Sequence, residues 1–177
     1  QEALIDEIIK GRDVLGIMPT GGGKSLCYQL PALLKEGVTI VISPLISLMK
    51  DQVDGLTENA IPSTYINSSL TAKELSERIR GVLMGEYKLL YVAPERLNAG
   101  DFLDMIYQLP ISLVAVDEAH CISQWGHDFR PSYKEIPKFI KRLKNRPPVA
   151  AFTATATEFV KDEIKLLLEL KNPYEVV

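Results

Sequence analysis

A run of three glycines followed by lysine and serine is the first feature of this sequence that predicts chemistry. The stretch Met18-Pro-Thr-Gly-Gly-Gly-Lys-Ser25 lies between a short apolar run and a helical pattern, which is the setting that a phosphate-binding loop requires. Gly21, Gly22 and Gly23 let the backbone turn its N–H groups toward a phosphate. A helix that follows such a loop adds its N-terminal dipole to the attraction.

Each polar residue of this loop has an expected role. Lys24 supplies a positive charge for the β- and γ-phosphates of a nucleotide, and Ser25 offers a hydroxyl to Mg²⁺. We expect Pro19 and Thr20 to contact the nucleotide together with the three glycines. Met18 stands where the strict pattern has its first glycine, which is a departure from that pattern. The alternative is an ordinary glycine turn without a ligand.

Two adjacent carboxylates end the apolar run Leu113–Val116. We expect Asp117 to lie beside the phosphate loop and to hold Mg²⁺ through water. Glu118 is expected to point the other way along the pleat and to polarise an attacking water. By itself such a pair is usually a polar strand end, but the loop about 90 residues upstream favours hydrolysis, with Lys24, Asp117 and Glu118 as the catalytic residues.

The elements that must position these residues are short apolar runs separated by helical patterns. Runs of four to six largely apolar residues are typical of strands buried on both faces of a parallel sheet. Strands that alternate with helices predict an α/β fold with a mostly parallel sheet and helices on both faces, and ligands bind at the carboxyl ends of such strands. The expected strands are Val14–Met18, Thr39–Ser43, Thr64–Asn67, Lys88–Ala93, Leu113–Val116 and Val149–Phe152.

Capping residues indicate where several helices begin. Thr71 and Glu74 have the spacing of a capping box, and Gly85 ends the helical pattern that follows. Thr155 and Glu158 repeat the box before another helical pattern. Asn98 is a further expected cap, for a helix over Phe102–Ile106.

The composition is that of one globular domain. The chain has 177 residues, 46% hydrophobic and 24% charged, and no apolar run approaches the roughly 18 residues of a membrane span. Its net charge of −3 argues mildly against a large basic surface for nucleic acid. The first residue is Gln1 rather than methionine, which favours a fragment of a longer protein.

Cysteine, histidine and the clustered basic residues are interpreted as structural. Two cysteines, Cys27 and Cys121, form no disulfide framework and are expected to be reduced and mostly buried. With two histidines in the chain, His120 beside the carboxylates does not predict a transition-metal site. A solvated helix face is the interpretation of the basic cluster Lys138, Lys141, Arg142, Lys144 and Arg146.

The phosphate loop and the acidic pair occur together with several other stretches, and the set resembles superfamily 2 helicases, most closely the RecQ family. Gln1 resembles the glutamine that reads the adenine edge in that family. The other stretches are similar to helicase motifs Ia (Ser43–Gln52), Ib (Val92–Leu97), II of the DEAH type (Asp117–His120) and III (Phe152–Thr155).

The stretch His120-Cys-Ile-Ser-Gln-Trp-Gly-His-Asp-Phe-Arg-Pro131 resembles the aromatic-rich loop that sets RecQ enzymes apart. Aromatic faces stack on bases without regard to sequence, so such a loop can sense single-stranded DNA and report to Glu118. A buried core anchor is the alternative role for Trp125. The DNA-contacting or coupling residues that we expect here are His120, Gln124, Trp125, His127, Phe129 and Arg130.

Two more motifs carry expected contacts. In motif Ia, Ser47 and Lys50 are expected to meet backbone phosphates of DNA, with helix capping and a solvated lysine as the alternative. In motif III, Thr153 and Thr155 are expected to link the γ-phosphate region to a second domain and to DNA. The alternative is that they end a strand and cap a helix.

The resemblance covers essentially the whole chain and implies a RecA-like P-loop domain. It implies that residues 1–177 are the first motor domain of an ATP-dependent 3′-to-5′ DNA helicase, with a second RecA-like domain and C-terminal regions outside this sequence. The implied cofactors are ATP and Mg²⁺, and the implied partners are single-stranded and duplex DNA and the second motor domain, with no membrane. The implied location is the bacterial nucleoid, which we favour, or a eukaryotic nucleus.

Two other classes of function compete with this interpretation. A small-molecule kinase also uses a phosphate loop, but it needs an acceptor pocket and lid residues, and it would leave the loop from His120 to Pro131 unexplained. A binding module with a dead ATPase site is the second rival. The intact set Lys24, Ser25, Asp117 and Glu118 argues against such degeneration.

Overall fold

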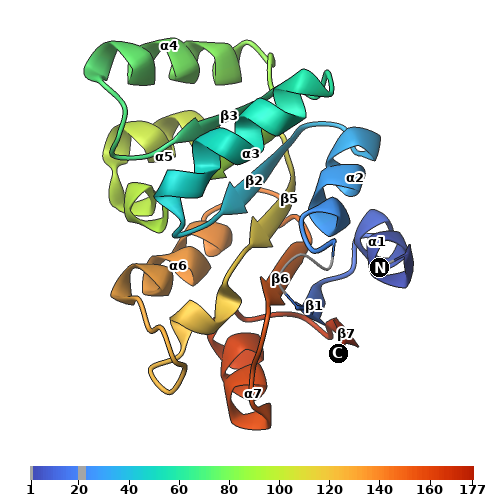
Figure 1. Ribbon diagram of the computed structural model, residues 1–177. Helices are drawn as coiled ribbons and strands as arrows, with labels where there is room; N and C mark the ends of the chain where they lie inside the picture. The colour runs from blue at the N-terminus through green and yellow to red at the C-terminus, as the bar shows by residue number, and fades with distance from the viewer. Residues whose placement is uncertain (1, 20–22) are drawn as a thin grey trace.

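A computed structural model describes residues 2–19 and 23–177 of the chain, and its centre is a twisted sheet (Figure 1). Seven strands pair in the order β3-β4-β2-β5-β6-β1-β7, and every pair is parallel. The α/β class with a parallel sheet is therefore confirmed. The strands are β1 (Val14–Ile17), β2 (Val38–Ile42), β3 (Ser63–Ile66), β4 (Leu89–Val92), β5 (Ile111–Val116), β6 (Val149–Thr153) and β7 (Tyr174–Val176).

All six strands expected from the sequence are present, with ends that differ by one or two residues. Sequence analysis missed β7, which has only three residues and pairs with β1 at the edge of the sheet. None of its residues is buried, and Glu175 lies between its two apolar side chains. A strand this short and exposed has no continuous apolar run by which to recognise it.

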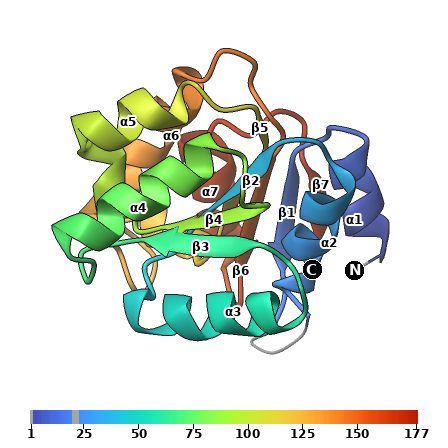
Figure 2. The same cartoon turned by 90° about the horizontal axis from the view of Figure 1, so that it is seen from above.

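Helices cover both faces of the sheet, as Figure 2 shows from above. On one face lie α1 (Glu2–Ile9), α2 (Leu26–Leu34) and α3 (Ile46–Glu58), and their buried side chains form one core cluster with alternate strand residues. On the other face lie α4 (Ala72–Leu83), α5 (Gly100–Ile106), α6 (Glu135–Lys141) and α7 (Glu158–Leu167), which form the second cluster. Three short 3₁₀ turns complete the described elements: η1 (Pro94–Asn98), η2 (Ala119–Ile122) and η3 (Pro131–Lys134).

The pleat explains why the central strands are largely apolar. In β2, Ile40 and Ile42 pack into the cluster of α4 to α7, whereas Val41 between them packs into the cluster of α1 to α3. Successive side chains of a strand point to opposite faces, so a strand covered on both sides is apolar at nearly every position. The apolar stretch of each central strand ends where the sheet is no longer covered on both sides. The polar residues of the phosphate-loop, acidic and threonine motifs begin there.

The predicted N-cap residue is correct for helix α4 and wrong for helices α5 and α7. Thr71 and Glu74 form both hydrogen bonds of a capping box at α4, and Gly85 follows that helix with φ of +74°. At α7 the cap is Thr157, whose Oγ1 accepts from the N–H of Val160 at 3.1 Å, and not the expected Thr155.

The third expected cap, Asn98, is also wrong. Asn98 is the last residue of the 3₁₀ turn η1, which begins at Pro94, so it is not the N-cap of α5. Helix α5 therefore begins at Gly100 and has Ala99 as its N-cap, without a side-chain hydrogen bond.

Candidate ATP site and aromatic-rich loop

The site forms at the carboxyl ends of β1, β5 and β6, where three motifs meet. The phosphate loop leaves β1, the acidic pair leaves β5, and Thr153 is the last residue of β6. The strands are neighbours in the sheet, so these ends are brought together although they are far apart in the sequence.

The phosphate loop is held to the sheet where it leaves β1. Met18 is buried in the cluster of α1 to α3, and its N–H donates to the carbonyl of Thr153 at 2.9 Å. The side chain that replaces the usual glycine therefore fills the core. Gly23 has φ of +78°, a conformation that favours glycine, and Pro19 is exposed. Four expected nucleotide contacts lie outside the described residues: Gln1, Thr20, Gly21 and Gly22.

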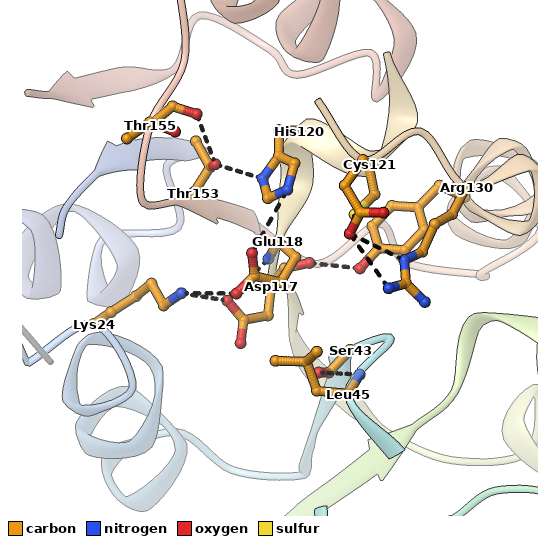
Figure 3. A network of polar contacts seen from close by, with 12 residues as sticks. Lys24, Ser43, Leu45, Asp117, Glu118, His120, Cys121, Arg130, Thr153 and Thr155 are labelled. Atoms are coloured by element: carbon orange, nitrogen blue, oxygen red, sulfur yellow. Dashed lines mark hydrogen bonds and ion pairs between the residues drawn. The ribbon is translucent and has the colours of Figure 1, made fainter. Parts of the chain in front are cut away.

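Lys24 contacts both acidic residues (Figure 3). Its Nζ lies 3.0 Å from Oδ1 of Asp117 and 3.4 Å from Oε1 of Glu118. Ser25 stands directly before α2, and its hydroxyl makes no capping hydrogen bond. A lysine charge, a hydroxyl and two carboxylates are thus gathered at the N-terminus of a helix.

The expectation that Glu118 points away from Asp117 is wrong. Glu118 has φ of +51°, in the left-handed region, and it lies two residues beyond the end of β5. The alternation of side chains across a pleat holds only for extended backbone, so this residue escapes it. Both carboxylates therefore face Lys24.

Burial and charge act together on this cluster. Burial raises the pKa of Asp117, and the ammonium of Lys24 opposes that shift. For Lys24, burial lowers the pKa, but Asp117 and Glu118 together outweigh it and the net shift is upward. Lys24 is therefore held in its charged form, ready for an anionic ligand.

A chain of polar contacts connects the acidic pair to motif III, and Figure 3 shows it from close by. Oε2 of Glu118 lies 3.7 Å from Nε2 of His120, and Nδ1 of His120 lies 2.7 Å from Oγ1 of Thr153. That hydroxyl donates its hydrogen to the carbonyl of Thr155 at 3.2 Å. Burial lowers the pKa of His120, so its ring is neutral at neutral pH.

The aromatic-rich loop carries an exposed tryptophan. Trp125 is 72% exposed, so it is not a core anchor, and its ring meets Phe159 of α7 edge to face with centroids 6.3 Å apart. His127 stacks on His120 with centroids 4.3 Å apart. An open cavity of about 440 Å³ lies between the loop and the start of α7, lined by His120, Trp125, Gly126, His127, Val160 and Thr155 to Thr157.

The remaining expected residues of the loop are placed as follows. Gln124 is exposed, and Phe129 and Arg130 are half-buried. The guanidinium of Arg130 lies 3.3 Å from a carboxylate oxygen of Asp128. Sequence analysis missed Phe159, which follows the cap of α7 and lies off the apolar face of that helix. A large aromatic residue off the buried face of a helix was the signal for it.

The residues of motif Ia stand apart from this cluster. Ser47 and Lys50 are exposed on α3, and Nζ of Lys50 pairs with Asp54 at 2.7 Å. Leu45 is the N-cap of α3, so Ser47 does not cap the helix. An exposed i,i+4 pair of this kind contributes little to stability, so Lys50 is available to a phosphate.

One group in the described residues has the spacing of metal ligands: His120, Cys121 and Asp128. These side chains have partners in the protein. Burial raises the pKa of Cys121 to about 12, so its thiol stays protonated, and Asp128 pairs with Arg130. His120 is engaged with Thr153. We therefore interpret the group as part of the structure of the loop.

Two solved helicase structures share the fold of this chain. The helicase domain of Pyrococcus furiosus Hef superposes with a TM-score of 0.74 at 21% identity, covering 99% of this chain and 36% of that one. A hypothetical ATP-dependent RNA helicase of Sulfolobus tokodaii gives the same TM-score at 19% identity. Likeness at this level of identity shows the fold.

The family follows from sequence comparison: the chain belongs to the DEAD/DEAH box helicase family, whose model matches residues 1–163. The ATP-dependent DNA helicase RecQ of Bacillus subtilis is 58% identical over 88% of this chain, and that of Pasteurella multocida is 50% identical over 98%. The helicase SGS1 of Saccharomyces cerevisiae is 46% identical over 96%. The resemblance to RecQ helicases is confirmed. The chain spans about a quarter of the bacterial relatives, 26% and 27%.

Proposed function

We propose that this chain is the first motor domain of a 3′-to-5′ DNA helicase that couples ATP hydrolysis to movement along single-stranded DNA and to unwinding. One observation carries the proposal: polar contacts run from Lys24 through Glu118 and His120 to Thr153, and the exposed Trp125 lies on the loop that begins at His120. A base stacked on that loop is thereby connected to the hydrolytic carboxylate. The names of the RecQ relatives support DNA as the nucleic acid.

The described residues fit MgATP. Lys24 would hold the β- and γ-phosphates, Ser25 and Asp117 would hold Mg²⁺, and Gly23 and Pro19 would border the phosphates, with Gln1, Thr20, Gly21 and Gly22 as further nucleotide contacts. Magnesium, when bound, neutralises charge that develops on the transferred phosphoryl group. Glu118 would orient the attacking water and accept its proton. A divalent ion at Asp117 suits a carboxylate whose charged form is disfavoured by burial.

ATP turnover by the intact protein is the test of this proposal. Phosphate release would be followed with no nucleic acid, with single-stranded DNA, and with RNA of the same sequence. We expect strong stimulation by DNA and loss of turnover in Lys24→Ala, whereas Lys73→Ala, an exposed lysine on α4, keeps it. Turnover without a response to nucleic acid would favour a small-molecule kinase, and no turnover would favour a binding module.

Direction of movement needs its own experiment. Partial duplexes with either a 3′ or a 5′ single-stranded tail would be offered to the intact protein with ATP. We expect strand separation only from the 3′-tailed substrate. Unwinding of the 5′-tailed substrate alone would contradict the proposed polarity without affecting the ATP site.

The second RecA-like domain is a proposed partner, and the isolated chain tests it. In motors of this type the ATP site lies between two domains, and the second supplies an arginine finger worth on the order of 10³–10⁵ in rate in related phosphoryl-transfer systems. We therefore expect the 177-residue chain alone to hydrolyse ATP very slowly and to unwind nothing. Strand separation at a rate near that of the intact protein would contradict the two-domain mechanism.

The relatives indicate a cellular location in general terms. They include bacterial and eukaryotic DNA helicases. No helix among the described residues is long and apolar enough to cross a membrane. We propose that the protein acts on chromosomal DNA, in the nucleoid if its source is bacterial and in the nucleus if it is eukaryotic.

A further inference from the structure

Tyr133 connects the far end of the aromatic-rich loop to the acidic pair. It lies in η3, directly after the loop, and its side chain is fully buried. Its hydroxyl donates to the backbone carbonyl of Asp117 at 2.7 Å. That carbonyl belongs to the peptide between Asp117 and Glu118, so the hydroxyl holds the peptide that leads into the hydrolytic residue.

The hydrogen bond from Tyr133 matters because the backbone of Glu118 is in an unfavourable conformation that neighbouring contacts must hold. A left-handed φ of +51° is unfavourable for a residue other than glycine, and it persists only where surrounding contacts hold it. The N–H of Glu118 donates to Oδ1 of Asp117 at 2.9 Å on one side of the peptide, and Tyr133 holds the carbonyl on the other. A small rotation of this peptide plane would swing the carboxylate of Glu118 away from Lys24.

The loop is closed at its base, so its two ends move together. The N–H of Arg130 donates to the carbonyl of Cys121 at 2.9 Å, and the N–H of Tyr133 donates to the carbonyl of Arg130 at 3.0 Å. The near end of the loop reaches the side chain of Glu118 through His120. The far end reaches the backbone before Glu118 through Tyr133. Both ends therefore converge on one dipeptide.

The hydroxyl is suited to this role because a tyrosine hydroxyl is protonated at neutral pH and can donate a hydrogen bond. The ring packs in the cluster of α4 to α7, so a phenylalanine would fill the same space. Removal of the hydroxyl would leave the ring in place and the carbonyl of Asp117 without this donor.

We propose that Tyr133 is a positioning residue that transmits occupancy of the loop to Glu118 through the Asp117 carbonyl. This inference rests on the proposed function, since it presumes hydrolysis stimulated by DNA. It adds a second connection to the one through His120. The expected signature is a loss of stimulation rather than a loss of ATP or DNA binding.

The test compares Tyr133→Phe with Tyr107→Phe in the intact protein. The hydroxyl of Tyr107 is also buried but has no hydrogen-bond partner among the described residues, and its ring stacks on Phe139, so it is a matched control. We expect Tyr133→Phe to lower the DNA-stimulated kcat roughly tenfold, the scale of a small misplacement of a catalytic group. The basal kcat should fall less than the stimulated kcat, and the KM for ATP and the Kd for DNA should each change by less than about twofold. In Tyr107→Phe all four quantities should change by less than about twofold.

Three outcomes would contradict this inference in different ways. A wild-type protein without DNA stimulation would overturn the proposed function and the inference with it. A stimulated wild type with an unchanged stimulation ratio in Tyr133→Phe would overturn the inference alone. A parallel fall of basal and stimulated rates, with a lower melting temperature, would mean that the hydroxyl only supports folding.

Discussion

Two largely buried ion pairs lie at opposite ends of the sheet, and only one of them leaves acceptor capacity for a ligand. At the amino ends of β1 and β6, Arg146 makes a bidentate pair with Asp13 at 3.0 and 2.7 Å. At the carboxyl ends of β1 and β5, Lys24 pairs with Asp117 at 3.0 Å. The two aspartates are similarly buried, with side chains 2% and 7% exposed.

The two pairs differ in how many hydrogen-bond and ion-pair partners the carboxylate oxygens have. Asp13 also accepts from the backbone N–H groups of Val149 at 2.9 Å and Lys171 at 2.7 Å, so both of its oxygens are occupied and it joins β1 to β6 and β7. In residues 2–19 and 23–177, the contacts made by the carboxylate of Asp117 both end on Oδ1. One pair closes the fold, whereas the other keeps acceptor capacity for a ligand such as a metal ion.

The largest expected effect concerns the carboxyl-end cluster. Glu118→Gln should lower ATP turnover in the intact protein by on the order of 10²–10⁴ because it removes the proposed base, whereas ATP binding should persist through Lys24 and Ser25. Phosphate release and nucleotide binding would both be measured. Glu77→Gln, an exposed glutamate on α4, is the control. Wild-type turnover in Glu118→Gln would mean that another group activates the water.

The next effect concerns the loop beside that cluster. Trp125→Ala should weaken single-stranded DNA binding by about 1–3 kcal/mol, the cost of one lost base stack. It should also reduce DNA-stimulated ATPase more than basal ATPase. The melting temperature should hardly change because Trp125 is mostly exposed. Equal loss of both activities, with a lower melting temperature, would show that Trp125 supports packing instead.

The smallest effect concerns two threonines near the start of α7, one that caps the helix and one that does not. Thr157→Ala should cost about 1 kcal/mol of unfolding free energy because it removes the helix cap. Thr155→Ala should leave stability unchanged, since its exposed side chain caps nothing. Thermal unfolding of the two variants would be compared. A larger loss of stability in Thr155→Ala would reverse the assignment of the cap.

The sequence predicted most of this arrangement because the central strands are short, apolar and evenly separated by helices. Helix starts were less predictable: Thr155 has the spacing of a capping box with Glu158, yet α7 begins at Glu158 and its cap is Thr157. The direction of Glu118 depends on a left-handed backbone that residue types do not reveal. Arg146 was grouped with a solvated basic face, although it pairs with Asp13, 133 residues earlier in the chain.

The central claim is that Asp117 serves chemistry and Asp13 serves the fold. Burial raises the pKa of Asp117 in the folded chain, so its ionised form lowers the free energy of unfolding at neutral pH, and Asp117→Asn should not destabilise the protein. Asp13→Asn leaves Arg146 without its charged partner and should cost on the order of 3 kcal/mol.

Melting temperature and DNA-stimulated ATPase, measured together on both variants of the intact protein, test this claim most directly. We expect Asp117→Asn to lose ATPase and to keep its melting temperature. Asp13→Asn should melt lower but hydrolyse ATP normally while folded. A well-folded Asp13→Asn without ATPase, or an Asp117→Asn that melts lower but retains turnover, would contradict it.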